Sequence, residues 1–494
     1  MSIETSPLVL AAQKYFQKEI KTAKVLEYFE MISSIPHVSH HESQLAAKIV
    51  EWAENQNLSA QIDDVGNVWI VKEPDLGYEN ATEIILQGHL DMVADKSEGN
   101  DFDFYKSGIP LEVTEDGFIK SSANTTLGAD NGIGVAFAMA VLTDKSIKTG
   151  KITALFTVAE ETGLEGAKKV VKEDLPSSGW LINLDSEGVT IGCAGGCTVN
   201  SQFKIKYEKD FIKGHAYKIE LSGLPGGHSG CDINKNHGNA IIAMLTFLKN
   251  FPQLYIHNIA GGSLPNVIPS SSKVICIATE DILADLTKEC TLYCQMLNKT
   301  IDVANNSISL TITPLEDKEL RCLSREFFSQ IIDVLLQIPD GVIAFNQKYN
   351  CVETSCNFAS ISIDNDVESI NLWFHPRSMY NNDWMAIVEK ITTLLNLLQA
   401  TTDSLHGYSG WVPKEDSQLI EKVNTIFTKF GNTPYLEVTH GGLECGHFAL
   451  LQPALDIISL GPDMIYDIHS YRERAHLKGI EDFWPILQEI VSCK

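Results

Sequence analysis

The chain has 494 residues, of which 44% are hydrophobic and 21% are charged; these values exclude a disordered or fibrous protein and predict a globular one with two or three domains. Its 64 acidic and 38 basic residues give a formal net charge of −26, which excludes nucleic acid and anionic membranes as partners. With no secretory leader and no apolar run of membrane-spanning length, we expect a cytoplasmic protein, and the odd number of cysteines, 11, predicts reduced thiols.

The first part of the chain predicts helices followed by a parallel sheet. Residues 8–55 show the apolar periodicity of two amphipathic helices, broken at Pro36. From residue 81 to residue 194, short apolar runs alternate with helical patterns, as they do in βαβ units. The elements expected there are buried strands at 84–87, 152–158 and 180–184, and a buried helix at 133–142.

The middle of the chain has a different pattern. After Gly196, alternating strands such as 217–221 and helices such as 239–249 predict an α+β region, and the α/β pattern returns near residue 402. The fold class predicted is therefore α/β with an inserted lid. The expected domains are an α/β domain formed by residues 1–196 and 400–494, and an α+β lid domain formed by residues 197–399.

Acidic and histidine side chains follow the ends of the predicted strands. His89 and Asp91 come after the first strand, Glu160 and Glu161 after the second, and Asp185 after the third. Because ligands bind open α/β sheets at the carboxyl ends of the strands, we expect these groups to gather in one crevice. Crowded carboxylates repel one another unless cations lie among them, and His, Asp and Glu together suit zinc or a similar divalent ion.

Asp130 and a distant histidine would complete such a centre. Asp130 lies in a glycine-rich turn before the buried helix, where the backbone can approach a ligand closely. Asp91, two residues after His89 on an extended segment, can contact the imidazole and fix its tautomer. A two-metal hydrolytic centre also needs a second imidazole, for which the pattern leaves His440 and His469 open.

Taken together, these motifs resemble those of the aminoacyl-histidine dipeptidases, a branch of the dizinc carboxypeptidase, deacylase and carnosinase group. The likeness covers essentially the whole chain, and the set of motifs is more specific than any single one. Ser470–Arg474 departs from the family pattern, which leaves substrate preference near the site open. The matching segments are Gly88–Val93, Thr125–Gly134, Phe156–Gly163, Leu181–Glu187, Gly192–Gly196, Gly223–Gly230, Leu443–Gly446 and His469–Ser470.

The resemblance implies a discontinuous dizinc-peptidase catalytic domain with an inserted lid. It also implies two divalent metal ions as cofactors, with Zn²⁺ preferred and Mn²⁺ or Co²⁺ as alternatives. By resemblance, His89 and Asp185 would bind one ion, Glu161 and His469 the other, and Asp130 would bridge them.

Further residues receive roles from the same resemblance. Glu160 matches the base that takes a proton from the attacking water, and Asp91 matches the residue that orients the metal-ligating imidazole. In the lid, His228 resembles the histidine that hydrogen-bonds the developing oxyanion, and Asn266 resembles a substrate contact. Arg377, one of only five arginines, resembles the residue that clamps the free carboxylate of the substrate.

We therefore predict a metal-dependent hydrolase of short unblocked dipeptides, Xaa-His dipeptides included. A homodimer formed through the lid is expected, and the sequence leaves open whether His228 acts in its own subunit or in the partner. The alternatives are an N-acyl amino acid deacylase or carboxypeptidase of the same group, and a non-catalytic metal-binding protein, against which the presence of Glu160 and Asp91 argues. A glycosidase with paired carboxylates would leave the histidines unexplained.

Overall fold

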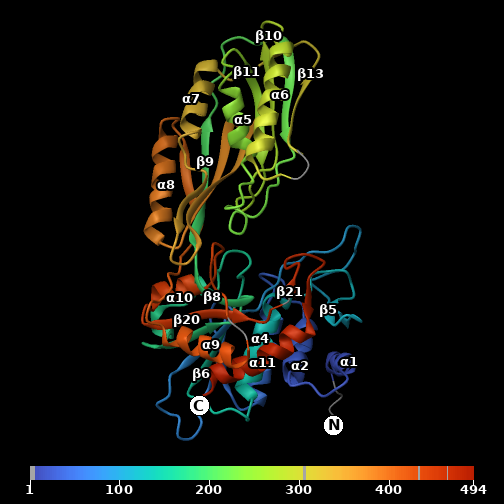
Figure 1. The fold of residues 1–494 in the computed structure, drawn as a ribbon, viewed down its shortest axis with the longest axis vertical. Helices are drawn as coiled ribbons and strands as arrows, with labels where there is room; N and C mark the ends of the chain where they lie inside the picture. Colours follow the sequence, from blue (N-terminus) through green and yellow to red (C-terminus); the bar gives the residue numbers. More distant parts are fainter. Residues whose placement is uncertain (1–5, 304–306, 432–433, 464, 494) are drawn as a thin grey trace. The chain divides into compact units, whose positions relative to one another are not determined.

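The computed structural model of the protein describes residues 6–303, 307–431, 434–463 and 465–493. The chain forms two compact units (Figure 1). No helix in the part of the chain that is described is long and apolar enough to cross a membrane. The domain boundaries expected from the sequence stay a prediction. Unit 1 comprises Met1–Cys193, Trp411–Val438 and Leu443–Lys494, and unit 2 comprises Ala194–Gly410 and Thr439–Gly442.

An eight-stranded mixed sheet lies at the centre of unit 1, within its described residues. The strand order is β1-β2-β6-β3-β7-β20-β8-β19, and the strands β6, β3, β7 and β20 run parallel to one another. Every residue of β3 is buried, as expected for a parallel strand covered on both faces. The strands are β1 Ser59–Ile62, β2 Val68–Lys72, β3 Ile84–His89, β6 Ile152–Thr157, β7 Gly179–Asn183, β8 Gly188–Cys193, β19 Leu436–Thr439 and β20 Leu455–Gly461.

Helices pack on this sheet. The helix α4 is buried along most of its length and contacts β3 and α2, as the apolar segment predicted. The expectation of two N-terminal helices was wrong, because α1 ends at Gln17, whose left-handed backbone (φ 53°) cannot continue a helix, and three helices form. The helices are α1 Pro7–Phe16, α2 Ala23–Ser33, α3 Ser43–Asn55, α4 Ala129–Thr143, α9 Gln418–Lys429, α10 Cys445–Leu451 and α11 Leu477–Val491, with 3₁₀ turns at Ala167–Lys169 and Lys172–Asp174.

A small second sheet of unit 1 joins the C-terminal segment to the region before α4. Its order, in the described chain, is β21-β22-β5-β4, and β22 pairs antiparallel with β5, Arg474 opposite Lys120. This pairing brings the segment that carries His469 close to the turn that carries Asp130. The strands are β4 Leu111–Val113, β5 Phe118–Ser121, β21 Ile465–Tyr466 and β22 Arg474–His476.

Unit 2 is built on a ten-stranded sheet, counted over the described residues. The order is β13-β10-β12-β11-β16-β17-β9-β18, with β14 beside β10 and β15 beside β16. The neighbouring strands pair antiparallel, for example β16 with β17, the pattern of an α+β region. The elements are β9 Gly195–Lys204, β10 Ile212–Ser222, α5 Ala240–Leu248, β11 Tyr255–Gly262, β12 Ser272–Ala278, α6 Leu283–Thr300, β13 Ser309–Pro314, β14 Lys318–Leu320, α7 Arg325–Leu335, β15 Gly341–Asn346, β16 Cys351–Asp364, β17 Ser369–Ser378, α8 Asn381–Asn396 and β18 Thr401–Tyr408.

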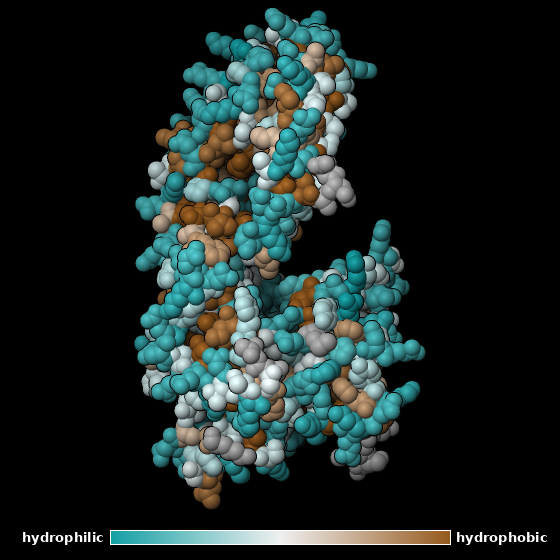
Figure 2. Space-filling view, viewed as in Figure 1, coloured by the Kyte–Doolittle hydropathy of each residue, from teal (hydrophilic) through white to brown (hydrophobic). Residues whose placement is uncertain are grey.

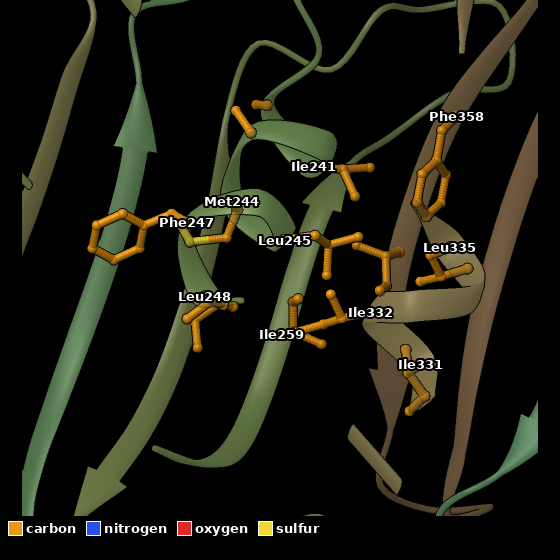
Figure 3. Packing of buried hydrophobic residues seen from close by; sticks show 14 of the residues in the cluster. Ile241, Met244, Leu245, Phe247, Leu248, Ile259, Ile331, Ile332, Leu335 and Phe358 are labelled. Carbon is orange, nitrogen blue, oxygen red and sulfur yellow. The ribbon is translucent and has the colours of Figure 1, made fainter. Parts of the chain in front are cut away.

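The core of unit 2 lies between this sheet and the helices α5 to α8. Ile241 and Leu245 of α5 belong to it together with Ile332 and Leu335 of α7 and Phe358 of β16 (Figure 3). Burying one such side chain contributes about 1.5–3 kcal/mol, so a continuous apolar cluster gives unit 2 a core of its own. The face of the molecule seen in Figure 2 is largely hydrophilic, in keeping with the net charge of −26.

Candidate metal centre

The candidate centre of unit 1 lies at the carboxyl ends of three adjacent parallel strands. His89 is the last residue of β3 and pairs with Thr157 at the end of β6, three residues before Glu160. On the other side of β3, Gln87 pairs with Asn183 at the end of β7, two residues before Asp185. The sheet register therefore brings the acids of both loops to His89, at the edge where the sequence predicted them.

The Asp130 carboxylate lies between the two imidazoles of the centre. Its Oδ1 is 3.0 Å from His89 Nε2 and its Oδ2 is 3.1 Å from His469 Nε2. Asp185 Oδ1 is 3.5 Å from His89 Nε2, and Glu161 Oε1 is 2.8 Å from His469 Nε2. These five side chains thus form two groups that share Asp130.

Each of these groups could hold a cation. The ligand atoms of His89, Asp130 and Asp185 all lie within 4.8 Å of one another, as do those of Asp130, Glu161 and His469. The buried Glu161 Oε1 is close to His469 but is not aligned as a hydrogen-bond acceptor. Imidazoles and carboxylates whose ligand atoms converge on a common point are expected of metal ligands, and this set of ligand types suits zinc. The residues therefore fit divalent ions.

The tautomer of His89 supports this fit. His89 Nδ1 lies 3.0 Å from the Asp91 carbonyl oxygen, which can only accept, so Nδ1 carries the proton. In the neutral ring, Nε2 then presents a lone pair to the carboxylates of Asp130 and Asp185. A lone pair that faces two carboxylates favours a positive charge between them, as a proton on Nε2 or as a metal ion.

The electrostatics of the centre point in the same direction. Burial and the neighbouring Asp130 charge raise the pKa of Asp185 to about 8. Burial, with the charges of Asp185 and Glu161, raises the pKa of Glu160 well above its usual value. Burial lowers the pKa of His469, but the nearby carboxylates of Asp130 and Glu161 outweigh burial and raise it to about 11. The cluster therefore attracts positive charge, as protons or as metal ions.

Asp91 does more than contact His89. Its carboxylate lies 3.4 Å from His89 Nδ1, farther than its own carbonyl. It accepts hydrogen bonds from Ser39 Oγ (2.8 Å) and from the backbone N–H groups of Glu160 (2.9 Å) and Glu161 (3.2 Å). Asp91 therefore holds both the imidazole and the turn that carries the two glutamates, and the sequence indicated only the first of these contacts.

Two buried glutamates near the centre were missed by sequence reasoning. Glu444 is fully buried and receives a short hydrogen bond from Gln87 Nε2, and its Oε1 finds no hydrogen-bond partner among the described residues. Glu473 accepts hydrogen bonds from four consecutive backbone N–H groups, those of residues 127 to 130. Burial raises the pKa of each carboxyl to about 7. Both glutamates stood in segments that the sequence comparison had singled out, but spacing alone gave them no role.

His440, the other candidate for the second imidazole, belongs to unit 2. Its Nε2 is 2.7 Å from Ser355 Oγ, and its carbonyl oxygen accepts from Arg377, whose Nη1 lies 3.4 Å away. Arg377 also donates to Tyr408 Oη at 2.7 Å, while its buried Nε has no hydrogen-bond partner in the part of the chain that the structure describes. The structure thus groups His469, and not His440, with the acids of unit 1, and leaves Arg377 buried beside neutral oxygens.

The other two lid residues expected from the sequence also lie in unit 2. The Nδ1 atom of His228 accepts from the backbone N–H of Gly230 at 3.1 Å, which places the proton of a neutral ring on Nε2. The loop that holds Asn266 is joined to this turn, because the Ser229 N–H donates to the Asn266 carbonyl at 2.8 Å. The Asn266 side chain is exposed.

The parallel strands and the gathered ligands are those of a metal-dependent hydrolase of the α/β class. The chain belongs to peptidase family M20/M25/M40, whose sequence pattern matches residues 85–492. It is 33% identical over 480 residues to the cytosol non-specific dipeptidase of Escherichia coli (strain K12), covering 94% of this chain and 96% of that protein.

Solved structures show the same fold. The aminoacylhistidine dipeptidase of Vibrio alginolyticus matches with a TM-score of 0.84 and 31% identity, covering 97% of this chain and 98% of that one. A tripeptidase of Staphylococcus aureus matches with a TM-score of 0.59 and 15% identity over 96% of this chain and 98% of that one. The family resemblance and the fold class predicted from the sequence, an α/β catalytic domain with an inserted lid, are confirmed.

Proposed function

We propose that this protein is a dipeptidase that works with two divalent metal ions, Zn²⁺ in preference to Mn²⁺ or Co²⁺. The observation that carries the proposal is the position of the Asp130 carboxylate between two imidazoles. One of its oxygens is 3.0 Å from His89 Nε2 and the other is 3.1 Å from His469 Nε2. Asp130 would bridge the ions, Asp185 would complete the ligand set of His89, and Glu161 would complete that of His469.

Glu160 is the proposed catalytic base. When bound, the two ions would polarise the scissile carbonyl and make water a nucleophile at neutral pH. Glu160 has a raised pKa because burial and neighbouring negative charge disfavour its ionised form. It would accept a proton from the attacking water and deliver it to the leaving amine. Asp91 holds the Glu160 backbone N–H at 2.9 Å and so fixes the base in place.

Unit 2 supplies the proposed substrate contacts. Arg377 is buried and its partners are neutral oxygens, so its charge suits the free carboxylate of a dipeptide. The Nε2–H of His228 would donate to the developing oxyanion, and the exposed amide of Asn266 would contact the substrate backbone. The named activities of the two similar proteins, non-specific dipeptidase and aminoacylhistidine dipeptidase, support unblocked dipeptides, Xaa-His included, as substrates.

A cytoplasmic location and a homodimer formed through unit 2 complete the proposal. The relative from E. coli is named as a cytosol enzyme, which supports the first. Val342, Ile343 and Phe345 are exposed apolar residues of β15, a strand whose one partner among the described strands is β16, and this exposed apolar surface supports the second. Light scattering of the purified protein tests the dimer. In a dimer, mixing subunits that carry His228→Ala with subunits that carry Glu160→Ala would restore activity only if His228 acts in the partner.

The experiment that tests the function combines metal analysis with a substrate panel. We expect two zinc ions per chain, loss of activity on chelation and its return with Zn²⁺. We also expect hydrolysis of free dipeptides and none of N-acetylated ones. Preferential cleavage of N-acyl amino acids would favour the deacylase alternative, and a chain that binds metal but cleaves neither class would overturn the enzyme assignment.

A further inference from the structure

Glu473 makes an unusual set of contacts with the turn before α4. Its Oε2 accepts from the N–H groups of Leu127 (2.8 Å) and Gly128 (3.0 Å), and its Oε1 accepts from those of Ala129 (2.8 Å) and Asp130 (3.2 Å). The residue is 3% exposed, so water does not compete for these bonds. One carboxylate therefore satisfies every backbone donor of the turn that ends in Asp130.

The turn needs this partner because α4 does not begin as a regular helix. Gly128 has a left-handed backbone (φ 72°), and Asp130 and Asn131 have non-helical backbone angles. The first N–H groups of a helix have no partner within the helix, and no side chain of the N-cap residue satisfies them here. Glu473 fixes the backbone from which the Asp130 side chain projects.

Glu473 is also close in sequence to His469. The segment between them is a tight turn, in which the Glu473 N–H donates to the Ser470 carbonyl at 2.9 Å and Ser470 Oγ donates to the Asp467 carbonyl at 2.8 Å. The His469 side chain is 50% exposed, so packing restrains it less than it restrains Asp130, whose side chain is 20% exposed. The Tyr471 N–H donates to Asp95 Oδ2 at 2.8 Å, and Glu473, four residues after His469, adds a buried anchor to the segment that carries the imidazole.

We infer that Glu473 is a positioning residue that joins the Asp130 turn to the His469 turn and thereby sets the metal affinity of the position formed by Asp130, Glu161 and His469. The inference rests on the proposed function. The position formed with His89 and Asp185 depends less on Glu473, because its other two ligands come from the ends of β3 and β7.

Glu481 provides a matched control. It lies in α11 of the same C-terminal region, is 8% exposed, and accepts from the backbone N–H groups of Lys21 (3.0 Å) and Thr22 (3.2 Å) and from Thr22 Oγ1 (2.7 Å). Glu481 thus caps the start of α2 as Glu473 caps the start of α4, but the residues that it holds, Lys21 and Thr22, are not among the five proposed ligands. A general loss of stability would affect both substitutions.

The test compares Glu473→Gln with Glu481→Gln in the full chain. Zinc affinity is measured by competition with a chromophoric chelator, metal content after dialysis, and folding by circular dichroism. Substitution of a residue that supports a metal ligand lowers metal affinity by about 10–100-fold. Glu473→Gln is therefore expected to weaken the binding of one of the two ions by this factor and to retain one ion after dialysis. Glu481→Gln is expected to retain both.

Wild-type affinity for both ions in Glu473→Gln, or an equal loss in Glu481→Gln, overturns the inference. If Glu473→Gln does not fold, Glu473→Asp serves instead, because it keeps the charge and withdraws the carboxylate by one methylene. Weaker binding of one zinc ion in this variant supports the inference. Unchanged affinity for both ions overturns it. Failure of the proposed function itself is seen separately, as a wild-type chain that binds no zinc or cleaves no dipeptide.

Discussion

Unit 1 contains a cluster of buried carboxylates, and unit 2 contains a cluster of buried basic residues, Arg377, His375 and His440. The two clusters favour charges of opposite sign. In unit 1, Asp130, Glu161 and Asp185 surround two imidazoles, and burial together with mutual repulsion raises the pKa of Asp185 to about 8. In unit 2, the hydrogen bonds of the buried Arg377 guanidinium to other described residues go to neutral oxygens, and its Nε has no partner among them.

The histidines of the two clusters respond in opposite directions. Carboxylates raise the pKa of His469 to about 11 despite burial. Burial and then the Arg377 charge lower the pKa of His440 to about 3, and the same causes lower the pKa of His375 well below its usual value. The cluster in unit 1 therefore lacks positive charge, which metal ions would supply, and the cluster in unit 2 lacks negative charge, which a substrate carboxylate would supply.

The largest effect is expected from Asp130→Ala, which removes the carboxylate shared by both ligand sets. Both ions should be lost, and activity should fall by more than about 10⁴-fold, beyond the loss expected from any one acid–base group. Metal content by mass spectrometry and turnover of a free dipeptide check this. Full zinc occupancy in this variant would contradict the role of Asp130 as the bridge.

Glu160→Ala should separate catalysis from metal binding. Because Glu160 is proposed as the base and not as a ligand, activity should fall by about 10²–10⁴-fold while both ions remain. Parallel measurement of kcat and bound zinc distinguishes the two roles, with Glu165→Ala as a control in the same loop region. Retained turnover would remove Glu160 from the mechanism.

Arg377→Lys tests whether Arg377 binds the free carboxylate of the substrate. Lysine keeps the charge but cannot present two parallel N–H groups to a carboxylate, so KM for a free dipeptide should rise by about 10–100-fold, with a smaller change in kcat. The control is Arg321→Lys, an exposed arginine of unit 2 that pairs with Glu368. An unchanged KM in the Arg377 variant would assign carboxylate binding elsewhere.

The smallest effect concerns the stability of unit 2 toward acid. The folded state keeps the pKa of His440 at about 3, against about 6.5 in the unfolded chain. The unfolded state therefore binds a proton that the folded state excludes, and stability present above pH 6.5 is lost as the pH falls toward 3. By about pH 5 the loss from His440 alone should be about 2 kcal/mol.

Urea unfolding across this pH range checks the acid sensitivity. His440→Asn should show a shallower decline in the free energy of unfolding than the wild type. His406→Asn, at an exposed position of the same unit, should decline as the wild type does. Identical slopes for all three chains would mean that His440 is not held neutral.

Much of the catalytic fold was predictable, because strand ends follow from local apolar patterns. His89, Glu160, Glu161 and Asp185 were placed at one sheet edge from the spacing of apolar runs alone, and the register of β3, β6 and β7 agrees. The break between α1 and α2 was missed because Gln17 carries no glycine or proline signal for the left-handed conformation that it adopts.

What the sequence could not show are contacts between buried polar groups that are far apart in the chain. Glu473 meets backbone donors some 343 residues away, and backbone N–H groups leave no trace in the residue pattern. The surroundings of Arg377 depend on Tyr408 and His440, which approach it only through the antiparallel sheet and the segment Thr439–Gly442. The variants above test the proposed ligands of the metal ions and the proposed contact of Arg377 with the substrate.

The order of the ligands along the chain has a consequence for biosynthesis. His89, Asp130 and Asp185 have all been translated before the first residue of unit 2, whereas His469 follows the whole of it. A nascent chain on the ribosome therefore carries one ligand triad for most of its elongation time, and the second becomes available only as synthesis ends. The position formed by Asp130, Glu161 and His469 can therefore assemble only when synthesis is nearly complete.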